Sequence, residues 1–518
     1  MIEESASIGR KLLLGSVLRV CNLIAAAIAS LLLMPFIVRH LGDRVYGFWS
    51  LAAALIGYYD LLDFGISSAV SQYLSLAIGS RNHDECRSVF NVALRIQSLL
   101  GGIALLLTAV IAAATPWFCH NPADAHLFWR VIVVLGINAA IAFPARVYGG
   151  VLAAELRFDT QAWLSILGLA LRTGLVVWVI LSGGGLLALA WVTLAATLPV
   201  TGLQVWFARR EALWARIESR SMEVQRAKSL FSYSIYTFLA FLADILRFQV
   251  DILIISGLIG LEAVTHYRVA GVFAQYYLQI LIVSVGMLQP ILSRFYGAGD
   301  HAALERLFFF GTKISSCISV FICLALIGWG KPFISRWMGP RYEDAYLPLV
   351  LLSLAVFLDV SQKPSIDLLY ATFKHKLYTY TNWGEGILNL ALSLLLARPL
   401  GIVGVAMGTL LGALVIRVLV QPWYVCKVSG FDYADYMRFF GKNLLYCGLL
   451  MGTAVGISAW GLHPNYLSLT SSAVCATVIY AIGCWRLVFN SSECERFRAA
   501  ITKRIGNEAD LEAKVATV

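Results

Sequence analysis

An all-α membrane protein with many transmembrane helices is the fold class that this sequence predicts. Hydrophobic residues fill 59% of the 518 positions and charged residues only 14%, whereas soluble globular proteins carry about 25% charged residues. Apolar runs of roughly 20 residues, the length that an α-helix needs to cross a bilayer, recur along the chain. The connections between these runs are short. We therefore expect a polytopic membrane protein without a separate soluble domain.

The apolar runs predict about 14 transmembrane helices. The first run follows Arg10 and Lys11 and is too long for the core of a signal peptide, so we expect it to be retained as a span. Six runs lie near residues 12–38, 46–78, 88–115, 128–155, 162–183 and 185–208. Eight more lie near residues 229–258, 264–292, 309–330, 346–372, 377–398, 401–424, 439–461 and 466–489. Because Asp60, Asp63 and Gly65 interrupt the second run, it is either one long helix or a broken one.

The distribution of Lys and Arg predicts that both termini are cytoplasmic. An even number of spans places both termini on one side of the membrane. With the N-terminus inside, the inner segments hold 23 Lys and Arg residues and the outer segments hold 6. This is the bias that the positive-inside rule expects. The longest inner connection, residues 207–228, is either an amphipathic helix on the membrane surface or an ordinary charged linker.

An internal repeat predicts two pseudo-symmetric six-helix lobes and a C-terminal helix pair. An offset of 218 residues aligns Gly42 with Gly260 and Tyr59 with Tyr277. Parallel repeats imply a pseudo-twofold axis along the membrane normal, with a cavity between the lobes. The predicted divisions are an N-terminal lobe (1–208), a basic cytoplasmic linker (209–228), a C-terminal lobe (229–424), the extra helix pair (425–489) and a basic cytoplasmic tail (490–518).

The Cys and His patterns favour no metal site or cofactor. The ten cysteines contain no C-x-x-C pair, and most of them lie inside apolar runs, where small-residue packing explains them. The eight histidines show no metal-ligand spacing. The net charge of +10 follows membrane topology, so we expect no nucleic-acid partner. Short outer loops leave no room for catalytic residues, so we expect that the protein is not an enzyme.

One span carries charges where a bilayer disfavours them. The stretch FLADILRFQVDILIISGLIG (241–260) places Asp244, Arg247 and Asp251 on one helical face, at spacings of three and four residues. A guanidinium near the middle of the bilayer costs about 2.5–3.5 kcal/mol on insertion scales, so it should face protein or a water-filled cavity. Arg247 therefore either helps to hold an anionic substrate or forms a structural ion pair with its two carboxylate neighbours.

Six motifs, in order along the chain, resemble those of bacterial polysaccharide flippases. The motifs are RHLGDRVYGFW (39–49), LLDFGISSAVSQY (61–73), DILIISGLIGLEAVTHYRVA (251–270), PILSRFYGAGD (290–300), KPFISRWMGPRY (331–342) and EGILNLALSLLLARPLGIVGVAMGT (385–409). The resemblance extends over residues 12–424. The family is the oligosaccharide-lipid (Wzx-type) flippases, within the multidrug/oligosaccharidyl-lipid/polysaccharide exporter superfamily.

The resemblance implies a transporter of the bacterial inner membrane. Such a protein moves an undecaprenyl-diphosphate-linked oligosaccharide from the cytoplasmic to the outer leaflet, for O-antigen or exopolysaccharide synthesis. It uses alternating access and no ATPase or covalent chemistry. Its expected partners are the lipid-linked substrate, membrane lipids and other polysaccharide-assembly membrane proteins.

Three other functions stay open at this point. A cation-coupled drug exporter of the same superfamily is disfavoured, because an excess of cavity arginines would repel cationic drugs. A membrane-bound glycan polymerase or ligase, which belongs to another class, needs a sizeable outer loop. A scaffold subunit of a glycan assembly complex is the third.

The deepest charged residues are the candidate site. A lipid diphosphate suits guanidinium forks, so we expect Arg247, Arg19 and Arg146 to bind it, together with Lys363. Carboxylates inside the spans are either counter-ions of these cations or sites of H⁺ or Na⁺ coupling. They are Asp60, Asp63, Asp244, Asp251, Asp359, Asp367 and Glu385.

Overall fold

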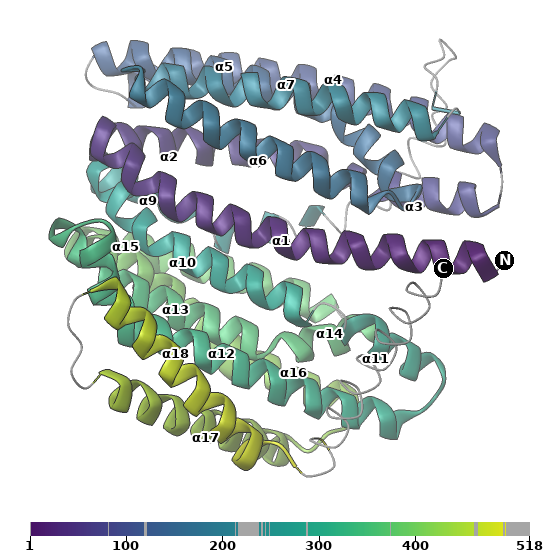
Figure 1. The fold of residues 1–518 in the computed structure, drawn as a ribbon, viewed down its shortest axis with the longest axis vertical. Coiled ribbons are helices and arrows are strands. Elements are labelled where there is room, and N and C mark those ends of the chain that lie inside the picture. Colours follow the sequence, from purple (N-terminus) through teal and green to yellow (C-terminus); the bar gives the residue numbers. More distant parts are fainter. Residues whose placement is uncertain are drawn as a thin grey trace, which may run out of the picture. The chain divides into compact units, whose positions relative to one another are not determined.

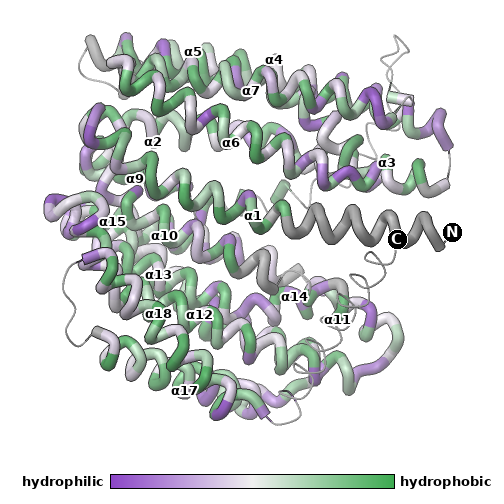
Figure 2. Tube along the Cα trace, in the orientation of Figure 1, coloured by the Kyte–Doolittle hydropathy of each residue, from purple (hydrophilic) through white to green (hydrophobic). Residues whose placement is uncertain are grey.

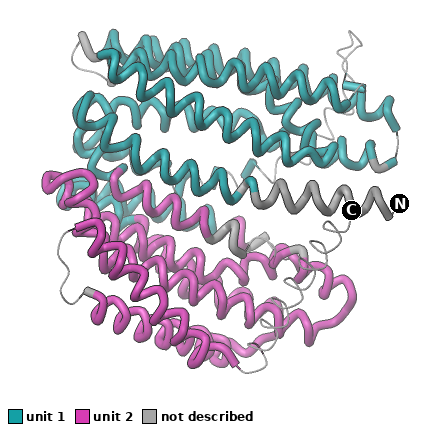
Figure 3. The backbone as a smooth tube through the Cα atoms, in the orientation of Figure 1, with its two compact units in different colours: residues 1–268, 382–408 teal, residues 269–381, 409–518 magenta. Residues whose placement is uncertain are grey.

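The computed structural model consists of helices joined by short connections (Figure 1). It describes residues 2–80, 82–118, 122–212, 214–215, 238–239, 242–243, 245–247, 249–285, 288–372, 374, 376–459, 465–490 and 493. No strand occurs within these ranges. The prediction of an all-α membrane protein is therefore confirmed. Residue contacts divide the chain into two compact units (Figure 3), unit 1 with residues 1–268 and 382–408, and unit 2 with residues 269–381 and 409–518. The predicted borders of the lobes, the linker and the tail stay predictions.

Unit 1 is a helical bundle arranged around α5. Its whole helices are α1 (Ile2–Leu41), α2 (Asp43–Gly57), α3 (Ile66–Gly79), α4 (His83–Phe118), α5 (Pro122–Ala154), α6 (Phe158–Leu181), α7 (Leu186–Glu211) and α9 (Val250–Leu258). The start of α10 (Leu261–Val285) and the middle of α15 (Lys376–Ala413) also belong to unit 1. Helix α5 contacts α2, α3, α4, α6 and α7. Aliphatic and aromatic residues such as Phe143, Val151 and Leu152 on α5 are fully buried in this bundle. Helix α1 packs on α6, and α9 packs on α2.

The second predicted span is broken. A 3₁₀ turn, η1 (Tyr58–Asp63), separates α2 from α3. Phe64 and Gly65 follow with φ angles of 48° and 74°, in the left-handed region that an α-helix cannot continue through. Asp63 then accepts hydrogen bonds from the backbone N–H and the hydroxyl of Ser67, in the first turn of α3. The polar residues of the sequence therefore mark a real interruption.

Unit 2 contains the helices of the C-terminal half. They are most of α10 (Leu261–Val285), α11 (Leu288–Gly297), α12 (His301–Trp337), η2 (Pro340–Ala345), α13 (Tyr346–Ser361), α14 (Lys363–Ala371), the ends of α15 (Lys376–Ala413), η3 (Leu414–Val420), α16 (Gln421–Ser429), α17 (Tyr433–Ala459), α18 (Tyr466–Gly483) and η4 (Cys484–Val488). Helix α12 packs against α13 and α17, and α17 packs against α18.

Eleven helical segments of the described residues are long and apolar enough to span a membrane. Hydrophilic residues gather near helix ends, for example at the turn between α11 and α12 (Figure 2). One segment, Tyr378–Ser429, has 52 residues and would be about 78 Å long, more than twice the thickness of the hydrocarbon core. It folds back on itself at Gly401, where the backbone is not helical (φ 60°, ψ −140°). The Ser393 hydroxyl therefore reaches the Val405 carbonyl, at 3.2 Å. The exact number of 14 helices stays a prediction.

Residues aligned by the repeat have matching structural roles within their own units. Tyr59 and Tyr277 are both 1% exposed. Tyr59 bonds the hydroxyl of Thr108 on α4 at 2.9 Å, and Tyr277 donates to the carbonyl oxygen of Ser319 on α12 at 2.7 Å. Gly42 and Gly260 have φ angles of 83° and 136°. Packing explains these tyrosines, and turn geometry explains these glycines.

The cytoplasmic end predicted for α5 and α7 is closed by polar contacts. Trp214, the first aromatic residue of the predicted linker, is buried and donates a hydrogen bond to Glu155 (3.3 Å). Burial raises the pKa of Glu155, and the bond from Trp214 opposes this rise. Burial lowers the pKa of Arg157, but Asp159 and Glu211 outweigh this effect, so the pKa is raised overall. Most of the linker (216–228) and of the tail (494–518) lies outside the described residues.

The approach of α5 to α4 depends on Gly136, which gives a test of this packing. A Cβ atom at position 136 would lie 2.2 Å from Oγ1 and 2.8 Å from Cβ of Thr108. We expect Gly136→Ala to destabilise the detergent-solubilised protein by about 1–3 kcal/mol, because the core is overpacked. Thermal melting followed by size-exclusion chromatography measures this. The control is Gly102→Ala on α4, where no atom lies within 4 Å. Equal melting temperatures of the two variants would contradict the observed packing.

Candidate functional site

Arg146 on α5 lies in a partly open cluster of charges. Its guanidinium bonds the Asp60 carboxylate through Nη2 and lies 3.8 Å from the Asp63 carboxylate through Nη1. The guanidinium carbon lies 4.8 Å from the ring centroid of Phe143, which restricts its orientation. The side chains of Arg146 and Asp60 are 31% and 49% exposed. The break at η1 brings both carboxylates to Arg146, and the cation stays accessible.

Asp63 has a different environment from Asp60. Its side chain is 11% exposed, and it accepts hydrogen bonds from Ser67 (2.6 Å) and from Gln97 on α4 (2.5 Å). Gln97 is fully buried. These hydrogen bonds hold the Asp63 carboxylate in one position. Asp63 therefore fixes the cluster to α3 and α4, while Asp60 is the more exposed counter-ion.

Arg247 is buried and paired with a carboxylate far away in the sequence. Its Nε and Nη2 atoms lie 2.9 and 2.8 Å from Oε1 of Glu385 on α15. The two side chains are 6% and 4% exposed. Removing one partner of a buried ion pair costs about 3–5 kcal/mol, because the other charge is left uncompensated. The pair therefore holds α15 against residues 245–247.

A polar stripe on α15 completes the environment of Arg247. Glu385, Asn389 and Ser393 are spaced four residues apart, so they share one helical face. Asn389 donates a hydrogen bond to the backbone carbonyl of Arg247 (3.0 Å), and Ser393 donates to Asn389 (2.9 Å). The candidate site predicted from the sequence does not include Asn389 and Ser393, because it contains only charged residues. The spacing of polar residues along an apolar helix was the signal that could have found them.

Asp251 contacts the tyrosine of the next helix. It is 4% exposed and accepts a hydrogen bond from the Tyr267 hydroxyl on α10. Asp251 and Arg247 thus both tie the charged stretch to other helices of unit 1. The side chain of Arg19 and the whole of Asp244 lie outside the described residues.

In unit 2, Arg417 is the most deeply buried cation of the described residues. Its side chain is 0% exposed, and Nε lies 2.9 Å from the Asp359 carboxylate on α13. Nη1 donates to Gln421 at 2.5 Å, and the Tyr378 ring centroid lies 5.4 Å from the guanidinium carbon. These contacts pair Asp359 with Arg417, and the predicted role of this carboxylate as a counter-ion or a coupling site stays a prediction.

Lys363 and Asp367 form an ion pair within one helix. They are four residues apart on α14. Lys363 is 29% exposed, whereas Asp367 is 1% exposed. Helix α13 ends just before them, and Gln362 at this break accepts a hydrogen bond from Tyr436 on α17 (3.0 Å). The described candidate residues thus lie in separate groups, each within its own unit. Three are ion pairs, one is the cluster of Arg146 with its two carboxylates, and Asp251 is bonded to Tyr267.

Relatives in sequence are similar to the chain over most of its length. The "Uncharacterized membrane protein EpsK" of Bacillus subtilis (strain 168) is 21% identical over 498 residues, which are 90% of this chain and 94% of that protein. The "Putative O-antigen transporter" of Shigella flexneri is 20% identical over 430 residues, which are 80% of this chain and 98% of the relative.

Solved structures of membrane transporters share the fold. The "Lipid II flippase MurJ, inward closed conformation" has a TM-score of 0.72 at 13% identity, over 91% of this chain and 98% of that one. The inward-facing conformation of a multidrug resistance MATE family transporter of the MOP superfamily has a TM-score of 0.68 at 14% identity. It covers 80% of this chain and 98% of the MATE chain.

A family model decides the assignment. The model described as "Polysaccharide biosynthesis protein" matches residues 36–347, which is more than half of the chain. This range contains Arg146 and its two carboxylates. The chain is a multi-pass membrane protein with the MATE and MurJ fold, and it belongs to the polysaccharide biosynthesis protein family.

Proposed function

We propose that this protein translocates an undecaprenyl-diphosphate-linked oligosaccharide from the cytoplasmic to the outer leaflet of a bacterial inner membrane. The product would serve O-antigen or exopolysaccharide synthesis. The observation that carries the proposal is the family match over residues 36–347. The named function of the Shigella flexneri relative and the fold shared with a lipid II flippase support it.

Drug export is the principal rival, and the fold does not exclude it. A multidrug resistance transporter and a lipid flippase both superpose on this chain. The family model favours polysaccharide synthesis. The Shigella flexneri relative is named as a transporter and MurJ as a flippase, and neither is named as a polymerase or ligase, in agreement with a protein that is not an enzyme. Cytoplasmic termini, coupling to H⁺ or Na⁺ and association with assembly proteins stay predictions.

Within this proposal, Arg146 is the first contact of the diphosphate. A diphosphate carries about two negative charges, and a guanidinium binds it through directed, charge-assisted hydrogen bonds. Arg146 is 31% exposed, whereas Arg247 is 6% exposed and paired with Glu385. An incoming phosphate can displace the half-exposed Asp60 more readily than the buried Glu385. Arg247 stays a predicted ligand, but holding α15 is the function that its contacts support.

Deletion of the gene tests the transport function. We expect loss of a surface polysaccharide and accumulation of its lipid-linked oligosaccharide on the cytoplasmic leaflet. Analysis of lipid extracts and of surface glycan measures both effects, with the complemented strain as the control. Unchanged surface glycan, in a strain without a second flippase, would contradict the proposal. Increased drug sensitivity with normal glycan would favour the drug exporter instead.

Substitutions of Arg146 and of its counter-ion test the binding site. Arg146→Ala should weaken binding of undecaprenyl diphosphate about tenfold or more, because a charge-assisted hydrogen bond contributes about 1.5–3 kcal/mol. Asp60→Asn should strengthen binding, because the competing carboxylate is removed while the cation remains. Binding to the purified protein in nanodiscs measures both. If the pair is only structural, both variants weaken binding together.

The starts of α2 and α10, both predicted to lie on the outer side, meet within unit 1, and we propose that this contact opens during transport. The hydroxyl of Thr265 on α10 donates to the backbone carbonyl of Asp43 at the start of α2 (2.7 Å). One turn further along α2, a Cβ atom at Gly47 would lie 2.0 Å from the Leu261 carbonyl oxygen. Only glycine permits this approach. Alternating access needs an outer end that closes tightly and then separates.

Gly47→Ala tests this contact. The added methyl group must push α2 and α10 apart, because its neighbour is backbone and cannot rotate away. We expect normal insertion but reduced surface polysaccharide in a complementation assay. The matched control is Gly57→Ala on the same helix, where no atom lies within 4 Å of the added carbon. Full complementation by Gly47→Ala, at equal protein amounts, would overturn the proposal.

A further inference from the structure

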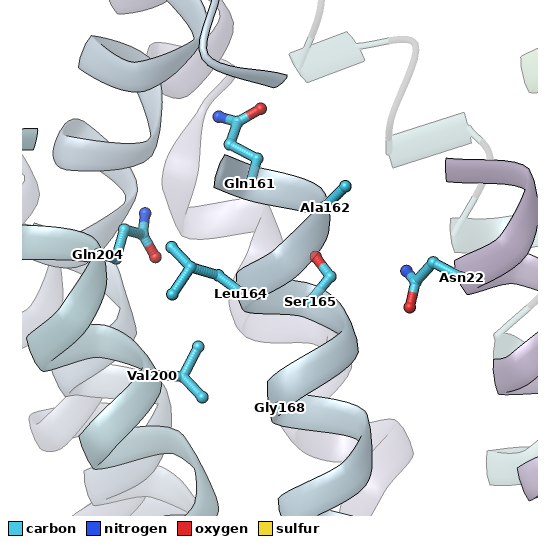
Figure 4. Close-up of a pocket in the computed structure, with 8 residues that line it drawn as sticks. All are labelled: Asn22, Gln161, Ala162, Leu164, Ser165, Gly168, Val200 and Gln204. Atoms are coloured by element: carbon cyan, nitrogen blue, oxygen red, sulfur yellow. The ribbon is translucent and has the colours of Figure 1, made fainter. Parts of the chain in front are cut away.

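A pocket of about 420 Å³ lies between α1, α6 and α7 in unit 1 (Figure 4). This volume falls within the range of small-molecule sites, about 300–1,000 Å³. Figure 4 shows Asn22 of α1 pointing towards Ser165 of α6, and Gln204 of α7 pointing towards α6 from the other side. The residues that line the pocket are Asn22, Gln161, Ala162, Leu164, Ser165, Gly168, Val200 and Gln204.

The lining is polar without being charged. Asn22, Gln161 and Gln204 supply carboxamides and Ser165 supplies a hydroxyl, while Leu164 is one of its apolar residues. The pocket lies within three candidate membrane spans. Polar groups placed in an apolar medium need partners. Gln161 and Gln204 find part of theirs on α5, and Asn22 and Ser165 add two further polar groups to the same pocket.

Helix α5 fixes the orientation of both glutamines. Nε2 of Gln161 donates to the Gly149 carbonyl (2.8 Å), and Nε2 of Gln204 donates to the Ala145 carbonyl (3.1 Å). With one N–H used in this way, each carboxamide keeps its oxygen as an acceptor and its second N–H as a donor. Arg146, the proposed diphosphate ligand, belongs to the same turn of α5 as these two carbonyl groups.

The chemistry of the lining selects one class of ligand. A phosphate needs cations or several N–H donors, and no Lys or Arg lines this pocket. A polyprenyl chain needs an apolar lining. Sugar hydroxyls both donate and accept hydrogen bonds, as carboxamides and serine hydroxyls do. The C–H face of a sugar ring fits against aliphatic side chains such as Leu164 and Val200.

We propose that this pocket binds an uncharged sugar unit of the translocated head group. The inference rests on the proposed flippase function and adds to it a site for the saccharide, separate from the diphosphate site at Arg146. Because Gln161 lies in the first turn of α6 and Gln204 in the last two turns of α7, the pocket is close to the predicted cytoplasmic ends of these helices. A sugar unit would therefore reach it from the cytoplasmic leaflet.

Two variants test the site without breaking the bonds to α5. Asn22→Leu removes a carboxamide, and Gly168→Leu fills the space beside Val200, where even a Cβ atom already makes ordinary contact at 3.5 Å. The matched control is Gly174→Leu on the same helix, an exposed position with no atom within 4 Å. The probes are undecaprenyl diphosphate without sugar and the same lipid carrying N-acetylglucosamine, glucose or galactose, bound to the full chain in nanodiscs.

We expect wild type to bind at least one sugar-bearing lipid more tightly than the sugar-free lipid. Both pocket variants should weaken that binding about fivefold, Asn22→Leu through the loss of one or two hydrogen bonds and Gly168→Leu by filling the space of the sugar. Both should leave binding of the sugar-free lipid unchanged. Gly174→Leu should leave the binding of both the sugar-bearing and the sugar-free lipids unchanged. Variants that bind all lipids like wild type, or that lose sugar-bearing and sugar-free lipids equally, would overturn the sugar site alone. Wild type that binds none of the lipids would overturn the flippase function and the sugar site together.

Discussion

The pairing of charges inside a bilayer is the constraint on which this structure depends. An unpaired charge in hydrocarbon is too costly to keep, so a buried cation needs a carboxylate or polar partner. Arg247 and Glu385 are joined across 138 positions of sequence. Arg417 is tied to Asp359 on another helix in the same way. These bonds require particular helix faces to meet, and they therefore position the helices as well as neutralise the charges.

The pairs differ in how much water they contact, and this difference separates structural from functional roles. Arg417 is 0% exposed and contacts Asp359 and Gln421, so its guanidinium is not accessible to an incoming anion. Arg146 and Asp60 are the most open of these pairs. Solvent screening makes such a pair weak, about 0–1 kcal/mol for exposed pairs, so an anion with more charge can replace the carboxylate. A weak ion pair neutralises the cation before the substrate arrives, and little free energy is needed to separate the pair when the substrate binds.

Interruptions of the membrane-spanning helices are the second feature that places polar side chains inside the bundle. The interruptions at η1 and at Gln362 each bring polar side chains into the membrane region. Non-helical backbone is tolerated at this depth only where other groups satisfy it. At η1 the result is the cluster of Asp60, Asp63 and Arg146, and at Gln362 it is the bond to Tyr436. The polar residues that weaken a span are thus the residues that build a site.

Local properties of the sequence determined the fold class, the polar interruption of the second span and the alignment of Tyr59 with Tyr277, whereas the structure decided that this span is broken at η1. These three features depend on composition, on backbone preference or on a sequence repeat. All of these can be recognised without knowledge of the tertiary contacts. The partners of the charges were decided only by tertiary structure. The sequence offered Asp244 and Asp251 as neighbours of Arg247, whereas the structure adds Glu385 and Asn389 from α15. Membrane helices are apolar on nearly every side, so periodicity does not reveal which face meets another helix. The rotation of each helix, and with it the choice of ion pairs and the carboxamide pocket, follows from packing across the whole bundle.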